Sequence, residues 1–126
     1  MTNNPFDIHS FLFRSKQKGT AVFQNITPAE LHSRLINSEM DPILLDVRTP
    51  FEYFRDGHLA GTVIIPLNEL LQMEPEIPKE KTIVLICRAG HRSQIACEYL
   101  ALQGHSKLYN LDGGMLAWHW EGLPYE

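Results

Sequence analysis

Short apolar runs alternate with helical patterns along most of the chain. Short, largely apolar runs predict strands at residues 43–47 (ILLDV), 62–65 (TVII), 82–87 (TIVLIC) and 107–111 (KLYNL), the first of them buried on both faces of a sheet. The segments between and around them predict helices at residues 28–36, 51–57, 68–71, 93–104 and 115–122. Strands that alternate with helices indicate an α/β domain with a mainly parallel sheet covered by helices on both faces.

Residues that favour helix ends support several of these boundaries. Thr27 and Glu30 form a capping box, with Pro28 at the first helical position. Asn68 and Ser93 are predicted to cap the helices that they precede. The side chains expected to face inward from the first of these helices are Leu31, Leu35 and Ile36.

The beginning of the chain differs in charge from the remainder. Residues 1–20 carry three basic and one acidic side chain, whereas residues 21–126 carry eight basic and fourteen acidic ones. We therefore expect an N-terminal accessory segment at 1–20 and one domain at 21–126. Asn4 as cap and Pro5 at the first helical position predict an amphipathic helix at residues 5–16. Packing on the domain and docking to a partner or a membrane surface are both open as its role.

The composition narrows the class of protein. A length of 126 residues, with 44% hydrophobic and 21% charged side chains, fits one folded domain. The net charge of −4 argues against a general nucleic-acid binder, and the apolar runs are too short to span a membrane. The first apolar run, FDIHSFLF, is a poor secretory signal. Because only Cys87 and Cys97 are present, we expect reduced thiols in a reducing compartment. Together with the poor signal and the short apolar runs, this predicts a cytoplasmic protein without stable membrane association.

The chemistry is concentrated where the most apolar predicted strand ends. Cys87 ends this strand, and the sequence RAGHRS follows it directly before a helix. A tight turn into a helix start aims backbone N–H groups at one point, and Arg88, His91 and Arg92 add positive charge. These features favour an ionised, nucleophilic Cys87 that faces a cradle for an anion. The alternative is that Cys87 is only a small buried hydrophobic residue.

Three separated segments resemble the rhodanese (thiosulfate sulfurtransferase) family. They are LLDVRTPFEYFRDGHLAGTVIIPL at residues 44–67, CRAGHRS at 87–93 and YNLDGGMLAWHWEGLP at 109–124, with ITPAEL at 26–31 preceding them in the family's order. The resemblance implies a single module with a five-stranded parallel sheet flanked by helices. It also implies that Cys87 accepts a sulfane sulfur from thiosulfate or a persulfide donor and passes it to cyanide, a thiol or a protein acceptor. No metal or organic cofactor is implied, and the cysteines and histidines lack convincing metal-ligand spacing.

The resemblance also suggests roles for the residues of the loop. The backbone N–H groups of Arg88, Ala89, Gly90, His91, Arg92 and Ser93 correspond to the cradle around the sulfur. Gly90 supplies backbone torsions that a side chain would resist. Arg88 and Arg92 are expected to orient the sulfonate end of thiosulfate, the alternative being solvated loop charges. His91 either lines the mouth of the pocket or tunes its charge near neutral pH, the alternative being an exposed histidine that is merely tolerated there.

Other residues of the matching segments are expected to support the loop. Asp46 and Arg48 follow a strand at the same sheet edge, and either form a buried ion pair or contact the substrate. Glu52 and His58 belong to the same motif and are expected to be structural. Cys97 is expected to pack in the core, with a resolving thiol as the alternative.

Two other functions compete with sulfur transfer by a general enzyme. Phosphatases and arsenate reductases also place a thiolate between a strand and a helix, but with five residues between the cysteine and the arginine. Here only four residues separate Cys87 from Arg92, and the smaller cradle should crowd a tetrahedral phosphate. A sulfur carrier or regulatory module dedicated to one protein partner would carry the same loop, so this second alternative stays open.

Overall fold

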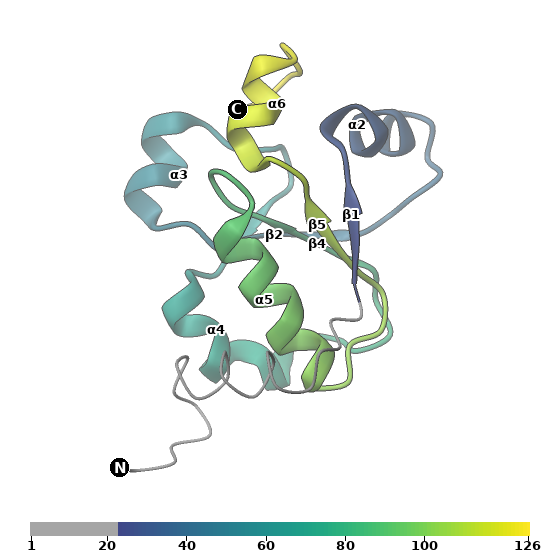
Figure 1. Ribbon diagram of the computed structural model, residues 1–126, viewed down its shortest axis with the longest axis vertical. Coiled ribbons are helices and arrows are strands. Elements are labelled where there is room, and N and C mark those ends of the chain that lie inside the picture. The colour runs from purple at the N-terminus through teal and green to yellow at the C-terminus, as the bar shows by residue number, and fades with distance from the viewer. Residues whose placement is uncertain (1–22) are drawn as a thin grey trace.

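A five-stranded parallel sheet forms the centre of the molecule in the computed structural model, which describes residues 23–126 (Figure 1). The strands are β1 (Gln24–Ile26), β2 (Ile43–Asp46), β3 (Val63–Ile64), β4 (Ile83–Ile86) and β5 (Leu108–Leu111). Their order in the sheet is β1-β5-β4-β2-β3, with all neighbouring pairs parallel. The α/β fold and its five-stranded parallel sheet are therefore confirmed. The helix predicted at residues 5–16 lies outside the described part of the chain.

Helices cover both faces of this sheet. They are α2 (Pro28–Ile36), α3 (Pro50–Asp56), α4 (Leu67–Met73), α5 (His91–Leu102) and α6 (Gly114–Trp120), with a short 3-10 helix η1 (Glu74–Glu76) after α4. Each helix predicted within residues 23–126 is present, with ends shifted by a few residues. The strand β1 has no counterpart among the predicted strands, because three residues at a sheet edge are too short for an apolar run to stand out.

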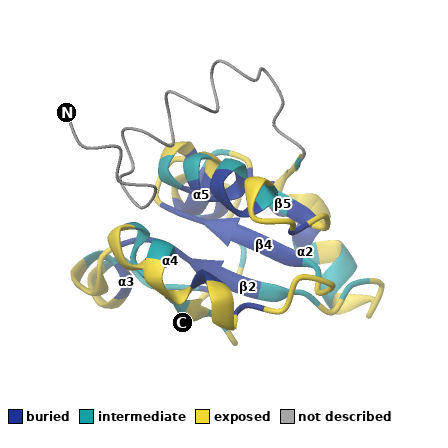
Figure 2. Ribbon diagram, turned by 90° about the horizontal axis from the view of Figure 1, so that it is seen from below, coloured by how far each residue is buried: buried dark blue, intermediate teal, exposed yellow. Residues whose placement is uncertain are grey.

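The central strand β4 divides the core into two apolar layers. Its four side chains are fully buried and alternate between the faces of the sheet, as the geometry of a strand requires. Ile83 and Leu85 pack in one cluster with residues of α4 and α5, whereas Val84 and Ile86 pack in the other with residues of α2 and α6. In Figure 2, β4 and most of β2 are accordingly dark blue and lie between helices that carry exposed residues in yellow. Because both faces of β4 are buried, its sequence is a continuous run of apolar residues.

The ends of several helices differ from the predictions. Thr27 does cap α2, and its side chain accepts a hydrogen bond from the Glu30 N–H. Ile36, however, is 64% exposed, because its position in α2 is turned about 140° from the buried Leu31. The cap position of α4 is Pro66, so Asn68 lies within the first turn and forms no capping hydrogen bond.

Candidate active site

The sulfur of Cys87 lies enclosed by the loop between β4 and α5. Cys87 follows the last residue of β4, and its side chain is almost fully buried at 1% exposure. The Gly90 N–H donates a hydrogen bond to Sγ at 3.1 Å, and the Ser93 Oγ lies 3.2 Å from the same sulfur. The loop thus places a backbone N–H and a hydroxyl group around the thiol, at the carboxyl end of the central strand.

Two glycines allow the loop after β4 to pack closely against the start of α6. Gly90 has a φ of +101°, in the left-handed region, and a Cβ there would lie 3.3 Å from the Gly113 nitrogen. Gly114 has a φ of +60°, and a Cβ there would lie only 2.5 Å from the carbonyl oxygens of both Cys87 and Arg88. The backbone torsion expected of Gly90 is therefore present.

The start of α6 holds the loop through backbone hydrogen bonds. The Met115 N–H donates to the Cys87 carbonyl, and the Leu116 N–H donates to the Arg88 carbonyl, both at 2.9 Å. These donors belong to the first turn of α6, where a helix leaves N–H groups without partners of its own. These hydrogen bonds hold the backbone of Cys87 and Arg88 against the start of α6, directly after the double glycine at residues 113–114.

Ser93 takes part in a buried polar network instead of capping α5. The cap position is Gly90, and Ser93 lies inside the helix as its third residue, which corrects the predicted capping role. Its hydroxyl donates to Asn110 Oδ1 at 2.5 Å, and the Asn110 amide donates to the Gly90 carbonyl at 3.3 Å and to Asn25 Oδ1 at 3.1 Å. Asn110 was not among the predicted site residues, although a polar residue within the apolar run of β5 was a signal for it.

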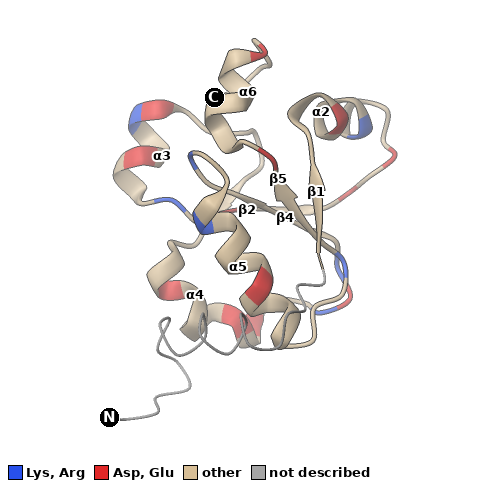
Figure 3. Cartoon of the chain, viewed as in Figure 1, with Lys and Arg blue, Asp and Glu red and all other residues tan. Residues whose placement is uncertain are grey.

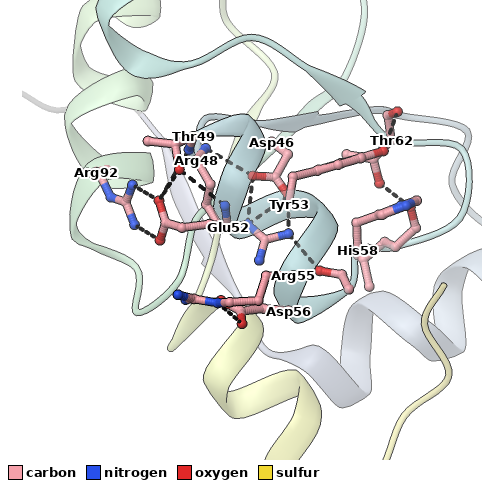
Figure 4. Close-up of polar contacts among 12 residues, drawn as sticks. Asp46, Arg48, Thr49, Glu52, Tyr53, Arg55, Asp56, His58, Thr62 and Arg92 are labelled. Atoms are coloured by element: carbon pink, nitrogen blue, oxygen red, sulfur yellow. Dashed lines mark hydrogen bonds and ion pairs between the residues drawn. The ribbon is translucent and has the colours of Figure 1, made fainter.

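Arg92 is held by an acidic residue from a distant part of the chain. Its guanidinium donates to both oxygens of Glu52 in α3, at 2.6 and 2.7 Å (Figure 4). Glu52 also accepts from the Thr49 N–H and so completes a capping box at the start of α3. The Arg92 hydrogen bonds are the main cause that lowers the pKa of Glu52 to about 2. Glu52 therefore couples α3 to the loop and neutralises one of its two arginines.

Arg88 and His91, in contrast, extend from the loop into solvent. Both residues are exposed, as is Ala89. Within residues 23–126, the structure gives neither the Arg88 guanidinium nor the His91 ring a hydrogen bond or an ion pair. Figure 3 shows basic positions at this loop, while acidic positions lie on α4 and farther along α5. Of the two loop arginines, Arg88 is thus the one that forms no ion pair with a residue in the range 23–126.

Asp46 and Arg48 form a fully buried ion pair, one of the two arrangements expected for them. Arg48 Nε and Nη2 donate to the Asp46 carboxylate at 2.8 to 3.1 Å, and Nη2 also donates to the Gly57 carbonyl at 2.8 Å. Both side chains have 0% exposure. The pair connects the end of β2 with the residue that follows α3 and so fixes the position of that helix.

His58 and Cys97 have structural surroundings. The His58 ring stacks on Tyr53 with 3.9 Å between ring centroids, and its Nδ1 donates to the Leu59 carbonyl at 3.1 Å. Cys97 is fully buried among apolar side chains, and this burial raises the pKa of its thiol. Core packing, as expected for Cys97, is what the structure shows.

Among residues 23–126, no group of three or more His, Cys, Asp or Glu side chains is arranged to hold a metal ion. None of the helices in the same range combines the length and the apolar character that crossing a membrane would require.

Comparisons with known proteins identify relatives of this chain and solved structures with a similar fold. Residues 27–121 match the family model described as a rhodanese-like domain. A sulfurtransferase of Allochromatium vinosum is 39% identical over 79% of this chain and 91% of its own length. Thiosulfate sulfurtransferase GlpE of Stutzerimonas stutzeri is 30% identical over 76% of this chain and 84% of its own length. The crystal structure of a rhodanese-related protein from Thermoplasma volcanium superposes with a TM-score of 0.73 at 31% identity, over 82% of this chain and 97% of that one.

Proposed function

Because the chain belongs to the rhodanese-like domain family, we propose that it is a sulfurtransferase in which Cys87 carries the transferred sulfur as a persulfide. The relatives named sulfurtransferase support the general role. More specifically, we assign thiosulfate, or alternatively a persulfide, as the sulfur donor. We assign cyanide or a thiol as the acceptor. The single observation that carries them is the placement of Cys87 Sγ, 3.1 Å from the Gly90 N–H and 3.2 Å from the Ser93 hydroxyl oxygen.

The reaction needs two displacements at sulfur. In the first, the Cys87 thiolate attacks the outer sulfur of thiosulfate, the S–S bond breaks, and sulfite leaves with the electron pair of that bond. In the second, a nucleophilic acceptor attacks the outer sulfur of the Cys87 persulfide, and the Cys87 thiolate leaves. Cyanide then becomes thiocyanate, and a thiol becomes a persulfide. The Gly90 N–H that donates to Sγ favours the thiolate as attacking and as leaving group in turn.

The two arginines of the loop have different roles in the proposed reaction. Arg88 is exposed and has no carboxylate partner among the described residues, so its planar guanidinium is available to the sulfonate end of thiosulfate. Arg92 is already bound to Glu52 by two short hydrogen bonds and supports the loop through them. The two cysteines form no disulfide, in keeping with activity in a reducing compartment such as the cytoplasm.

Intact-protein mass spectrometry after incubation with thiosulfate tests the covalent step. We expect the protein to gain one sulfur atom, to lose it on treatment with a reductant, and to form thiocyanate when cyanide is supplied. Cys87→Ser should show neither the added sulfur nor turnover, whereas Cys97→Ser serves as the matched control and should show both. Turnover of Cys87→Ser at the rate of the unmodified protein would exclude this mechanism, and hydrolysis of 4-nitrophenyl phosphate in place of sulfur transfer would favour a phosphatase.

A further inference from the structure

The Ser93 hydroxyl lies between two acceptors in the core beside the nucleophile. Its oxygen is 2.5 Å from Asn110 Oδ1 and 3.2 Å from Cys87 Sγ. Ser93 and Asn110 are buried, at 0% and 4% exposure. They meet there because β4 and β5 are neighbours in the sheet and α5 packs against both (Figure 1). A hydroxyl group has one hydrogen to donate, so Ser93 donates to only one of these two atoms at a time.

The side-chain amide of Asn110 has only one orientation that satisfies its neighbours. Its Nδ2 lies 3.3 Å from the Gly90 carbonyl oxygen, which can only accept a hydrogen bond. Nδ2 also donates to Asn25 Oδ1 at 3.1 Å. Because both amide hydrogens are used in this way, Oδ1 faces Ser93 and accepts from its hydroxyl. The Ser93 hydrogen is therefore held by Asn110, and the Ser93 oxygen presents a lone pair to Sγ.

This arrangement favours the protonated form of Cys87. A thiol can donate its S–H to the Ser93 oxygen, which completes a chain of hydrogen bonds from Sγ to Asn110 Oδ1. A thiolate needs donors, and the Gly90 N–H supplies one at 3.1 Å. For Ser93 to supply a second donor, its hydroxyl must rotate toward Sγ and leave the buried Oδ1 without one, which costs free energy. Asn110 and the Cys87 thiolate thus compete for the same hydrogen.

We propose that Asn110 is a positioning residue that holds the Ser93 hydrogen while Cys87 is a thiol and releases it when the sulfur ionises. The inference deepens the proposed function and rests on it, because it concerns the ionisation of the same nucleophile. The proton lost from Sγ passes to water, and only the Ser93 hydroxyl turns, so no bond between heavy atoms forms or breaks. Asn110 acts on the sulfur through Ser93 and reduces the fraction of Cys87 that is ionised in the free protein.

Charged and titratable groups on the elements packed around Cys87 are retained when residue 110 is substituted. On β5, Tyr109 packs in the other core cluster, and α6 reaches Cys87 with the Met115 N–H. The loop, the adjoining part of α5 and the end of β2 contribute Arg88, His91, Arg92, Cys97 and the Asp46–Arg48 ion pair. A change in the ionisation of Cys87 therefore has two possible origins, which are the Ser93 hydrogen and movement of the loop.

A double-mutant cycle between residues 93 and 110 separates these two origins. The fraction of thiolate is followed against pH by its ultraviolet absorbance, from which that of the same variant carrying Cys87→Ser is subtracted. We expect Asn110→Leu to lower the midpoint of this titration by about one pH unit, because the freed Ser93 hydroxyl can donate to the thiolate. In a Ser93→Ala protein, which has no hydroxyl to free, the same substitution should leave the midpoint unchanged. Asn110→Ala should behave like Asn110→Leu, and urea unfolding shows which variants are folded at each pH.

Asn25→Ala is the matched control, because it removes one hydrogen bond of the Asn110 amide and leaves Oδ1 in contact with Ser93. Its midpoint should equal that of the unmodified protein. A shift of equal size with and without the Ser93 hydroxyl would overturn the inference, since movement of the loop would then be responsible. The absence of a downward shift in both Asn110→Leu and Asn110→Ala would also overturn it. The titration needs no turnover, so failure to form thiocyanate from thiosulfate and cyanide would refute the proposed function separately.

Discussion

Arg92 in the first turn of α5 and Glu52 in α3 form a bidentate ion pair across 40 positions of the chain. Each of the two hydrogen bonds is short, at 2.6 and 2.7 Å. The pair ties the helix that follows β2 to the loop that follows β4. It also separates the roles of the two loop arginines, because Arg92 already has a carboxylate partner whereas Arg88 has none within residues 23–126.

Substitution of Arg88 should affect donor binding more than substitution of Arg92. We expect Arg88→Gln to raise the KM for thiosulfate about tenfold, because it removes a charged donor that is free to meet the sulfonate. Arg92→Gln should raise this KM less and should lower the free energy of unfolding instead. Steady-state kinetics with cyanide as the acceptor, together with urea unfolding of both variants, measure the two effects. The reverse order of KM values would show that Arg92 leaves Glu52 to bind the donor.

The same ion pair makes a predictable contribution to acid stability. The pKa of Glu52 is lowered from its usual value near 4.5 to about 2, chiefly by the hydrogen bonds from Arg92. A carboxyl group whose pKa is lower in the folded state stabilises the fold above the unfolded pKa, and this contribution is lost as the pH falls toward 2. Glu52→Gln keeps an acceptor for Thr49 but loses the charge, so it should be less stable at pH 7 by about 1 kcal/mol, since the pair is partly exposed.

Urea unfolding of the unmodified protein and of Glu52→Gln between pH 7 and pH 2 measures this contribution. The difference in unfolding free energy should be constant down to about pH 5 and then shrink. Glu30→Gln is a suitable control, because its contact with Arg34 is long at 3.9 Å and exposed. A difference for Glu52→Gln that does not change with pH would indicate that packing, and not the charge, is responsible.

The order of apolar and polar residues within individual segments was enough to predict most of the helices and strands. The apolar runs at 43–47 and 82–87 contain β2 and β4, because a strand covered on both faces needs consecutive apolar residues. The torsion of Gly90 could be expected for a similar reason, since a tight turn into a helix start restricts which residue fits there. These features depend on neighbours in the sequence or on the common geometry of parallel sheets.

Contacts between distant segments were harder to anticipate. Glu52 was expected to be structural, and its pairing with Arg92 depends on how closely α3 approaches the loop. Ser93 was expected to cap a helix, but the start of α5 at His91 turns its hydroxyl to Cys87 and Asn110. A capping preference is a local property, whereas this network depends on β4 and β5 being neighbours in the sheet.

Gly114 should be nearly irreplaceable, because it combines a left-handed torsion with close backbone contact. Gly114→Ala would place a Cβ 2.5 Å from the carbonyl oxygens of Cys87 and Arg88, so the loop or α6 must move. We expect a loss of about 3 kcal/mol in unfolding free energy, with contributions from torsion and from overlap, and loss of sulfur transfer. Thermal or urea unfolding and the thiocyanate assay measure both.

Gly122→Ala isolates the contribution of the torsion. Gly122 has a similar φ of +68°, but a Cβ there would meet nothing within 4 Å. This variant should lose only about 1 kcal/mol and should retain sulfur transfer. If both alanine variants were equally stable and active, close packing of α6 against the loop would not be what requires Gly114.

Cys97 should be dispensable for sulfur transfer and important only for packing. It is fully buried in the apolar cluster between the sheet and α5, where burial raises the pKa of its thiol. Cys97→Ala should keep the thiosulfate-dependent gain of one sulfur and lose about 1 kcal/mol of stability through the small cavity that it leaves. Mass spectrometry and urea unfolding test this. Loss of turnover in a Cys97→Ala protein that still folds and still takes up one sulfur would favour the resolving-thiol alternative.

Asn110 should influence the ionisation of Cys87 through Ser93. The Ser93 hydroxyl lies between the two residues, 3.2 Å from Sγ and 2.5 Å from Asn110 Oδ1. Asn110→Asp introduces a negative charge of similar shape at this position, and a negative charge close to a thiolate makes it harder to form. The rise of kcat/KM with pH should therefore move to higher pH by about one unit, and activity at high pH should be retained. Asn110→Ser is the uncharged comparison and should lower activity without this shift. A pH profile of Asn110→Asp that coincides with that of the unmodified protein would mean that Asn110 only holds Gly90 and β1 in place, because its amide hydrogen bonds reach both.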